Sequence, residues 1–166
     1  MSQHGYVYLC YHKVEAAFAI QLATDLLNAD IQVWMDVLDI EEGDEWYLSV
    51  ETAKQNCSAF LPIMSPDYVT SSYGQDELAF AERTGKLVFP VLLRPVNAAD
   101  WPAQVGYRQY VDFDNWQDPQ TYAGHLERLV AVLKQSGVVK YQPDARLEPR
   151  YFRSLTAMIE VHKTFR

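Results

Sequence analysis

Residues 59–80, AFLPIMSPDYVTSSYGQDELAF, combine an apolar run, a polar turn and an amphipathic segment in one short stretch. The first six residues are apolar throughout, which is typical of a strand that is covered on both faces of a parallel sheet. SPDYVT is predicted to be a loop. A helix is expected over about 74–84, because Gly85 follows it and glycine favours the position after a helix C-terminus. A strand followed by a loop and a helix is the repeating unit of an α/β sheet.

The same alternation runs along most of the chain. Strands are predicted at 6–11, 31–35, 59–64, 86–93 and 108–113, and helices at 14–29, 45–55, 74–84 and 120–135. Pro90 interrupts the fourth strand and weakens its expected pairing, because proline donates no backbone hydrogen bond. Strands that alternate with helices pair in parallel through right-handed crossovers. The sequence therefore predicts an α/β, flavodoxin-like doubly wound sheet of about five parallel strands flanked by helices.

The predicted elements end well before the last residue of the chain. We expect a single domain over 1–136, because a chain of 166 residues suits one sizeable core. Residues 137–149, GVVKYQPDARLEP, are predicted to be a linker. Residues 150–166 are predicted to contain a helix that packs on the domain or leads into a further region.

Charge and composition exclude several classes of function. The net charge is −8, which argues against non-specific binding to nucleic acid or to an anionic membrane surface. The chain has no apolar run of about 18 residues, so no transmembrane helix is expected. The first ten residues, MSQHGYVYLC, lack the basic region and cleavage site of a signal peptide. These features favour a cytoplasmic location.

Metal and cofactor signatures are also missing from the sequence. Cys10 and Cys57 each lie in an apolar stretch, as buried reduced thiols usually do. The four histidines lack the spacing of metal ligands, and the acidic residues of 36–45 do not match a calcium loop. No glycine-rich phosphate loop is present. We therefore expect no bound metal and no resident cofactor.

Ligands of open α/β sheets bind beyond the carboxyl ends of the strands. The loops at 10–13, 36–46, 65–73 and 94–95 are expected to meet at that edge. Glu77 is placed in the first turn of the helix that follows the third of these loops. From the residues alone, two interpretations stay open: Glu77 interacts only with the helix dipole, or it points at a ligand.

Four segments in order resemble the conserved boxes of the Toll/interleukin-1 receptor (TIR) domain, in its bacterial and plant-like catalytic branch. The segments are YVYLCYHK (6–13), IQVWMDVLDIEEGDEW (31–46), FLPIMSPDYVTSSYGQDELAFA (60–81) and LVFPVLLRP (87–95). The resemblance covers roughly residues 5–135. It implies an NAD⁺ glycohydrolase or cyclase of bacterial antiphage signalling that releases nicotinamide together with ADP-ribose or a cyclic isomer.

By this resemblance Glu77 is the catalytic residue, four positions after an aromatic residue and directly before Leu78. NAD⁺ would be the substrate rather than a cofactor. The implied substrate-binding residues are Cys10, Tyr11, His12, Asp36, Trp46, Tyr73 and Arg94. The chain departs from the family pattern at Tyr6, Cys10, Tyr73 and Gly74, and the tyrosine at 73 replaces a tryptophan that is usual there.

The resemblance also implies self-association through TIR–TIR contacts that involve residues 37–46, with activity that depends on assembly. Two other functions remain open. One is a non-enzymatic module that binds other TIR domains, as adaptors and virulence factors do. The other is a nucleoside deoxyribosyltransferase, which also places a glutamate beside a sugar.

Overall fold

The computed structural model describes residues 5–36, 46–106 and 109–137. Its strands are β1 (Tyr6–Cys10), β2 (Gln32–Trp34), β3 (Ala59–Met64), β4 (Leu87–Val88), β5 (Val91–Leu92) and β6 (Val111–Asp112). They form one sheet in the order β2-β1-β3-β5-β6, with β4 also paired to β3, and all of these strand pairs are parallel. The predicted flavodoxin-like α/β class is confirmed.

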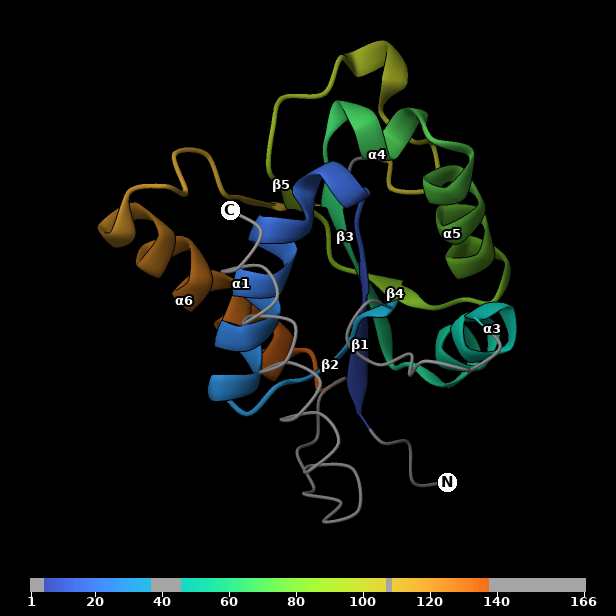
Figure 1. Cartoon of the computed structure of the whole chain (residues 1–166), viewed down its shortest axis with the longest axis horizontal. Helices are drawn as coiled ribbons and strands as arrows, with labels where there is room; N and C mark the ends of the chain where they lie inside the picture. Colours follow the sequence, from blue (N-terminus) through green and yellow to red (C-terminus); the bar gives the residue numbers. More distant parts are fainter. Residues whose placement is uncertain (1–4, 37–45, 107–108, 138–166) are drawn as a thin grey trace.

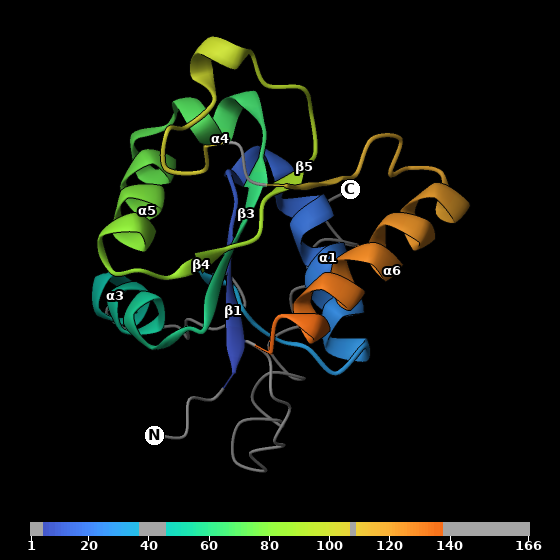
Figure 2. The ribbon, with the colours of Figure 1, turned by 180° about the vertical axis from the view of Figure 1, so that it is seen from behind.

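Helices cover both faces of this sheet, as the two opposite views show (Figures 1 and 2). One layer contains α1 (Ala16–Asn28) and α6 (Pro119–Gln135), and the other contains α3 (Trp46–Asn56) and α5 (Ser72–Arg83). The short helix α4 (Pro66–Thr70) lies at the carboxyl end of β3, and the 3₁₀ turns are η1 (Lys13–Glu15) and η2 (Ala98–Asp100). Gly85 follows α5 with φ of 67°, as the sequence predicts for a glycine after a helix.

The residues of β1 alternate between two separate hydrophobic cores. Val7 and Leu9 pack in the core under α1 and α6, whereas Tyr8 and Cys10 pack in the core under α3 and α5. This alternation follows from the two-residue period of side chains along a strand. All six residues of β3 are buried, in agreement with the prediction that this strand is covered on both faces.

The fourth predicted strand is broken in two. β4 pairs with Ala59 and Phe60 of β3, and β5 pairs with Ile63 and Met64. Pro90 lies between the two pieces, where its missing N–H leaves the ladder interrupted. The fifth strand is also shorter than predicted, since β6 contains two residues.

The segment SPDYVT is not a loop, which corrects the prediction from sequence. Pro66–Thr70 form helix α4, and the hydroxyl of Ser65 accepts a hydrogen bond from the backbone N–H of Tyr68 at 3.2 Å. Serine at the N-cap followed by proline at the first helical position is a common way to begin a helix. Ser65 and Pro66 are therefore a helix-start signal that is visible in the sequence.

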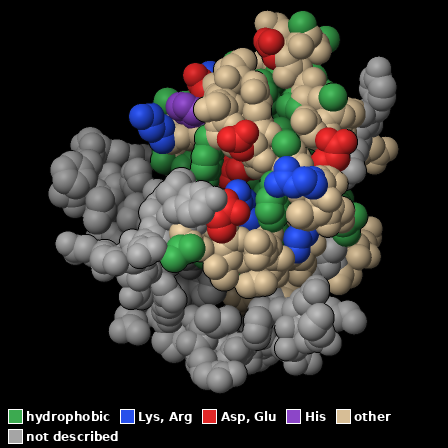
Figure 3. All heavy atoms as spheres, turned by 90° about the vertical axis from the view of Figure 1, so that its right-hand side faces the viewer, with side chains coloured by type: hydrophobic (Ala, Val, Ile, Leu, Met, Phe, Trp, Pro, Cys, Tyr) green, Lys and Arg blue, Asp and Glu red, His purple; other side chains and the backbone are tan. Residues whose placement is uncertain are grey.

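Other predictions lie outside the described residues. These are the loop at 37–45, the linker at 137–149 beyond its first residue, and the helix expected within 150–166. Within the described ranges, no helix has both the length and the apolar character needed to cross a membrane. Seen from the side of α3 and α5, charged side chains of both signs are interspersed over the surface (Figure 3).

Candidate active site

Glu77 is buried in the core between the sheet and α5. The sequence analysis places Glu77 in the first turn of its helix. The helix begins at Ser72 after the N-cap Ser71, so Glu77 belongs to the second turn instead. The helix dipole acts mainly on the first turn and therefore does not account for an acid here. Glu77 is only 1% exposed, which removes the interpretation of an ordinary solvated carboxylate.

The two oxygens of this carboxyl group have different surroundings. The hydroxyl of Tyr68 donates a hydrogen bond to Oε1 at 3.2 Å, and both side chains are buried. Oε2 is buried as well but has no hydrogen-bond partner among the described residues. A buried polar atom without a partner costs free energy, and folded proteins contain few of them.

Burial raises the pKa of Glu77 from its ordinary value of 4.5 to about 8. The hydroxyls of Tyr8, Tyr68 and Tyr73 act in the opposite direction, and the charge of Asp36 adds to the upward shift. Because desolvation dominates, the carboxyl group is mostly protonated at neutral pH in this closed state.

Tyr8 and Tyr73 meet beside this carboxyl group. Their hydroxyl oxygens lie 3.4 Å apart, and Tyr8 comes from β1 whereas Tyr73 comes from the first turn of α5. Tyr8 is almost completely buried and Tyr73 is half-buried. The charge of Glu77 raises the pKa of both phenols, after the larger effect of burial.

Cys10 belongs to the same cluster. It is 1% exposed, and its Sγ lies 3.7 Å from the carbonyl oxygen of Tyr8. Burial raises the pKa of this thiol well above its ordinary range, and the neighbouring Glu77 raises it further. The thiol is therefore a neutral packing group beside the carboxyl rather than a nucleophile.

Tyr11 and Asp36 form a second polar pair at the ends of the first two strands. The hydroxyl of Tyr11 donates to Oδ1 of Asp36 at 2.8 Å. Burial and this carboxylate together raise the pKa of Tyr11. Trp46 is the first residue of α3, but its side chain lies outside the description, so its predicted stacking role stays a prediction.

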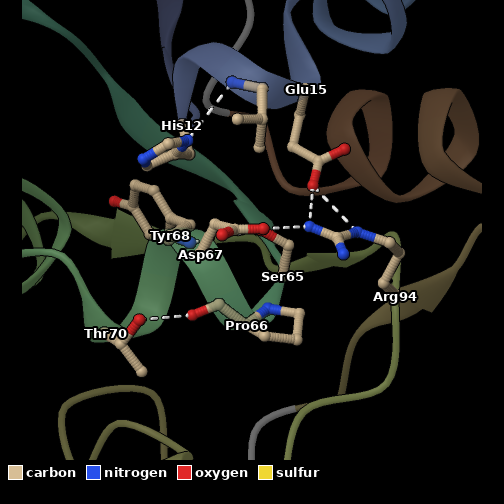
Figure 4. A network of polar contacts seen from close by, with 9 residues as sticks. His12, Glu15, Ser65, Pro66, Asp67, Tyr68, Thr70 and Arg94 are labelled. Carbon is tan, nitrogen blue, oxygen red and sulfur yellow. Dashed lines mark hydrogen bonds and ion pairs between the residues drawn. The ribbon is translucent and has the colours of Figure 1, made fainter.

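Arg94 lies in an exposed ion-pair network at the same edge of the sheet (Figure 4). Its guanidinium contacts Glu15 from η1 and Asp67 from α4, and the Nε–Oε1 distance to Glu15 is 2.9 Å. The two carboxylates raise the pKa of Arg94 further. The predicted contact with a substrate phosphate stays a prediction, and it would require these carboxylates to release the guanidinium.

His12 lies in the same view and has a structural task (Figure 4). Its Nδ1 accepts a hydrogen bond from the backbone N–H of Val14 at 3.2 Å and so caps η1. The structure thus brings Tyr73, Cys10 and Glu77 into one cluster and links Tyr11 to Asp36. It places Arg94 in separate contacts.

A groove of about 800 Å³ opens on the loop that follows β5, and its lining includes Trp101 and Tyr110. Of the predicted site residues whose side chains the structure describes, none lines this groove. Among the residues that the structure describes, no group of three or more His, Cys, Asp or Glu side chains could hold a metal ion. The sealed carboxyl of Glu77 therefore remains the strongest candidate for chemistry.

The profile of the TIR domain family matches residues 7–130. The chain belongs to the TIR domain family. A search of curated proteins found no match. Solved structures with the same fold include the TIR domain of the Toll-related receptor TRR-2 from Hydra magnipapillata, with 21% identity and a TM-score of 0.62, over 77% of this chain and 97% of that one.

Two further structures share the fold of this TIR domain. A TIR-STING receptor from C. gigas in complex with 2′,3′-cGAMP has 15% identity and a TM-score of 0.58, over 76% of this chain and 41% of the receptor. The TIR domains of the activated Roq1 resistosome, which recognises the effector XopQ, have 14% identity and a TM-score of 0.50, over 93% of this chain and 96% of that one. At these identities the likeness extends to the fold alone.

Gly74, one of the departures noted in the sequence, has a steric reason in this TIR domain. A Cβ atom at this position would lie 2.3 Å from the carbonyl oxygen of Tyr68. Only glycine therefore allows α4 to approach α5 this closely. The close approach brings the ring of Tyr68 against Glu77.

Two residues of this cluster, Tyr8 and Tyr68, were missed by sequence reasoning. Tyr8 is two positions before Cys10, so the period of a strand places both side chains on one face. Tyr68 lies in the segment that is predicted to be a loop, where its side chain is not expected to be buried. A helix over Pro66–Thr70, packed against α5, would have directed attention to it.

Proposed function

We propose that this TIR domain is an NAD⁺ glycohydrolase or cyclase in which Glu77 is the catalytic residue. The observation that carries the proposal is the carboxyl of Glu77, which is buried in the core with one oxygen that has no hydrogen-bond partner in the described part of the chain. Membership of the TIR family supports the choice of NAD⁺ as substrate. The products would be nicotinamide and ADP-ribose or a cyclic isomer.

The proposed reaction suits a single acid. Breaking the bond between the nicotinamide nitrogen and C1′ of the ribose releases neutral nicotinamide from a cationic ring, so the leaving group needs no proton. Positive charge develops on C1′ and the ring oxygen of the sugar. A carboxylate beside the ribose would stabilise that charge, and water or a second nucleophile would then complete the reaction at C1′.

The raised pKa of Glu77 fits this scheme. The carboxyl is mostly neutral in the closed state, because burial brings its pKa to about 8. A cationic nicotinamide ring beside it would favour the ionised form. The substrate would thus generate the carboxylate that acts on it, and kcat/KM would rise with pH through the pKa of the free enzyme.

The proposed site must open before it can act. The hydroxyl contact between Tyr8 and Tyr73 and the low exposure of Glu77 describe a closed state. We infer that self-association, through contacts that involve residues 37–46, promotes the open state. Residues 37–45 lie outside the described part of the chain; the related fold in the Roq1 resistosome supports an assembly without specifying its geometry.

The alternative is a non-enzymatic TIR–TIR interaction module in the same kind of signalling. The burial of Glu77 favours it, because a residue that is 1% exposed also fits a purely structural role. In that case the surface of residues 37–46 would be the functional one.

Nicotinamide release from NAD⁺ separates the two functions. Protein at high concentration, or clustered on a scaffold, is mixed with NAD⁺ and compared with the Glu77→Ala and Glu77→Gln variants. The enzyme predicts a loss of about 100-fold or more in both variants, as for other electrostatic groups. Absence of release from clustered wild-type protein would favour the interaction module, and release that persists in Glu77→Ala would exclude Glu77 from the reaction.

A further inference from the structure

Among the described residues, the carboxyl of Glu77 is hydrogen-bonded through one of its two oxygens. Tyr68 donates its hydroxyl to Oε1 at 3.2 Å, while Oε2 has no partner among the described residues although it is buried. The hydrogen bond limits rotation of the carboxyl about its last side-chain bond. The two oxygens are therefore not equivalent, and the free one is available to a group that enters from outside.

Tyr68 is itself held in place by its backbone. Its N–H donates to the hydroxyl of Ser65 at 3.2 Å, and its carbonyl oxygen accepts the hydroxyl of Ser71 at 2.7 Å. The hydroxyl of Ser71 in turn caps α5 by accepting the N–H of Gly74 at 2.9 Å. The end of α4 and the start of α5 are thus joined through Tyr68, whose side chain is completely buried.

The junction of α4 and α5 is held by local hydrogen bonds as well as by packing. Ser65 and Ser71 form hydrogen bonds with the backbone of Tyr68. Because Gly74 has no Cβ atom, the carbonyl group of Tyr68 can approach α5 closely. The product of these contacts is one phenol hydroxyl at a fixed place beside one carboxyl oxygen. Side chains that act in catalysis are commonly held in this way by a surrounding set of hydrogen bonds.

We propose that Tyr68 is a positioning residue, which holds Oε1 of Glu77 so that Oε2 is the oxygen presented to the ribose. This inference rests on the proposed function for its catalytic part. Its structural part, the control of the carboxyl by the phenol, stands on the geometry alone. Tyr68 acts through Glu77 and does not itself contact the substrate.

The test replaces the hydroxyl and keeps the ring, with the variant Tyr68→Phe. The matched control is Tyr122→Phe, which removes another phenol donor to a carboxylate, Asp25 at 2.6 Å, on the opposite face of the sheet. The first readout needs no substrate: the carboxyl carbon of Glu77 is titrated by NMR in ¹³C-glutamate-labelled protein and assigned with Glu77→Gln.

In Tyr68→Phe the pKa of Glu77 rises by about one unit, because a hydrogen bond that favours the anion is lost. It stays unchanged in Tyr122→Phe. In clustered protein, Tyr68→Phe lowers kcat about tenfold or more with little change in KM, and moves the rising limb of the pH–rate profile to higher pH. A purely structural role of Tyr68 would not change the pKa of Glu77, kcat and the pH–rate profile together.

The inference is overturned if Tyr68→Phe leaves both the titration of Glu77 and kcat as in the wild type. It is also overturned if Tyr122→Phe shifts them equally. If wild-type protein releases no nicotinamide while the titration still shifts in Tyr68→Phe, the control of the carboxyl is supported and the proposed function fails. The two failures are therefore distinguishable.

Discussion

The two faces of the sheet bury tyrosine–carboxyl pairs in contrasting ways. Under α1 and α6, Tyr122 donates to Asp25 at 2.6 Å at the margin of an aromatic core that contains Phe18 and Phe113. Under α3 and α5, Tyr68 donates to Glu77 at 3.2 Å inside the core. The first pair keeps its acid half-buried, and the second seals its acid from water.

This contrast indicates a division of tasks between the faces. The α1/α6 face gains stability from apolar burial. On the α3/α5 face, the burial of an acid in an apolar setting lowers the stability of the fold. Such local conflicts with the rules of folding are typical of functional sites. Four predictions bear on this division.

The largest effect is expected on the apolar face. Phe113 is completely buried and makes edge-on contacts with Phe18 and Tyr122. Phe113→Ala is expected to lower the free energy of unfolding by about 3–5 kcal/mol, through lost burial and the cavity left behind. Denaturant titration measures this change, and it should be similar at pH 6 and pH 9. Val132→Ala, at a residue that is 41% exposed, is the control and should change little.

The second prediction concerns the sealed acid. The pKa of Glu77 is about 8 in the folded chain against 4.5 ordinarily, so the folded state holds the extra proton between these pH values. The contribution of Glu77 to the free energy of unfolding is therefore largest below about pH 4.5. It falls by up to about 1.4 kcal/mol per pH unit until pH 8. Glu77→Gln should remove this fall and therefore be more stable than wild type at pH 9, by about the whole of the fall.

Unfolding curves of both proteins across pH 5–9 measure this difference, since the two proteins share every other titrating group. Parallel pH dependences would show that Glu77 titrates normally. In that event the burial of Glu77 would not lower the stability of the α3/α5 face, and the contrast between the two faces would be lost.

The third prediction tests the approach of α4 to α5. Gly74→Ala places a Cβ against the carbonyl oxygen of Tyr68 and should cost about 1–3 kcal/mol of stability. Gly124→Ala in α6 is the matched control, because no atom lies within 4 Å of its added Cβ. There alanine should stabilise the helix by up to about 1 kcal/mol. Equal effects of the two substitutions in thermal unfolding would contradict the steric account of Gly74.

The smallest effect is expected at the exposed edge. Arg94→Gln breaks the contacts with Glu15 and Asp67, yet the change in stability should stay below about 1 kcal/mol because the side chains of Arg94 and Asp67 are exposed to solvent. Nicotinamide release should show a raised KM if Arg94 reaches a phosphate. An unchanged KM would assign Arg94 to the surface network alone.

The sequence was sufficient for the fold because burial patterns in this chain are strong. The apolar runs at 6–11 and 59–64 correspond to β1 and β3, and the helix predicted at 120–135 corresponds to α6. Glu77 was found through a family resemblance, since no spacing of residues marks a lone acid. Its burial could not be predicted, because it depends on helix α4, and the sequence analysis predicts a loop over that segment.

The broken fourth strand has a consequence for motion within the sheet. Pro62 in β3 and Pro90 between β4 and β5 each lack an amide proton, so two short ladders replace one long ladder here. We expect the ladder from Ile63 and Met64 to β5 to open independently of the ladder from Ala59 and Phe60 to β4. Amide exchange in the β3–β5 pairing should then be uncoupled from exchange in the β3–β4 pairing, so the two ends of this strand pair are expected to open separately.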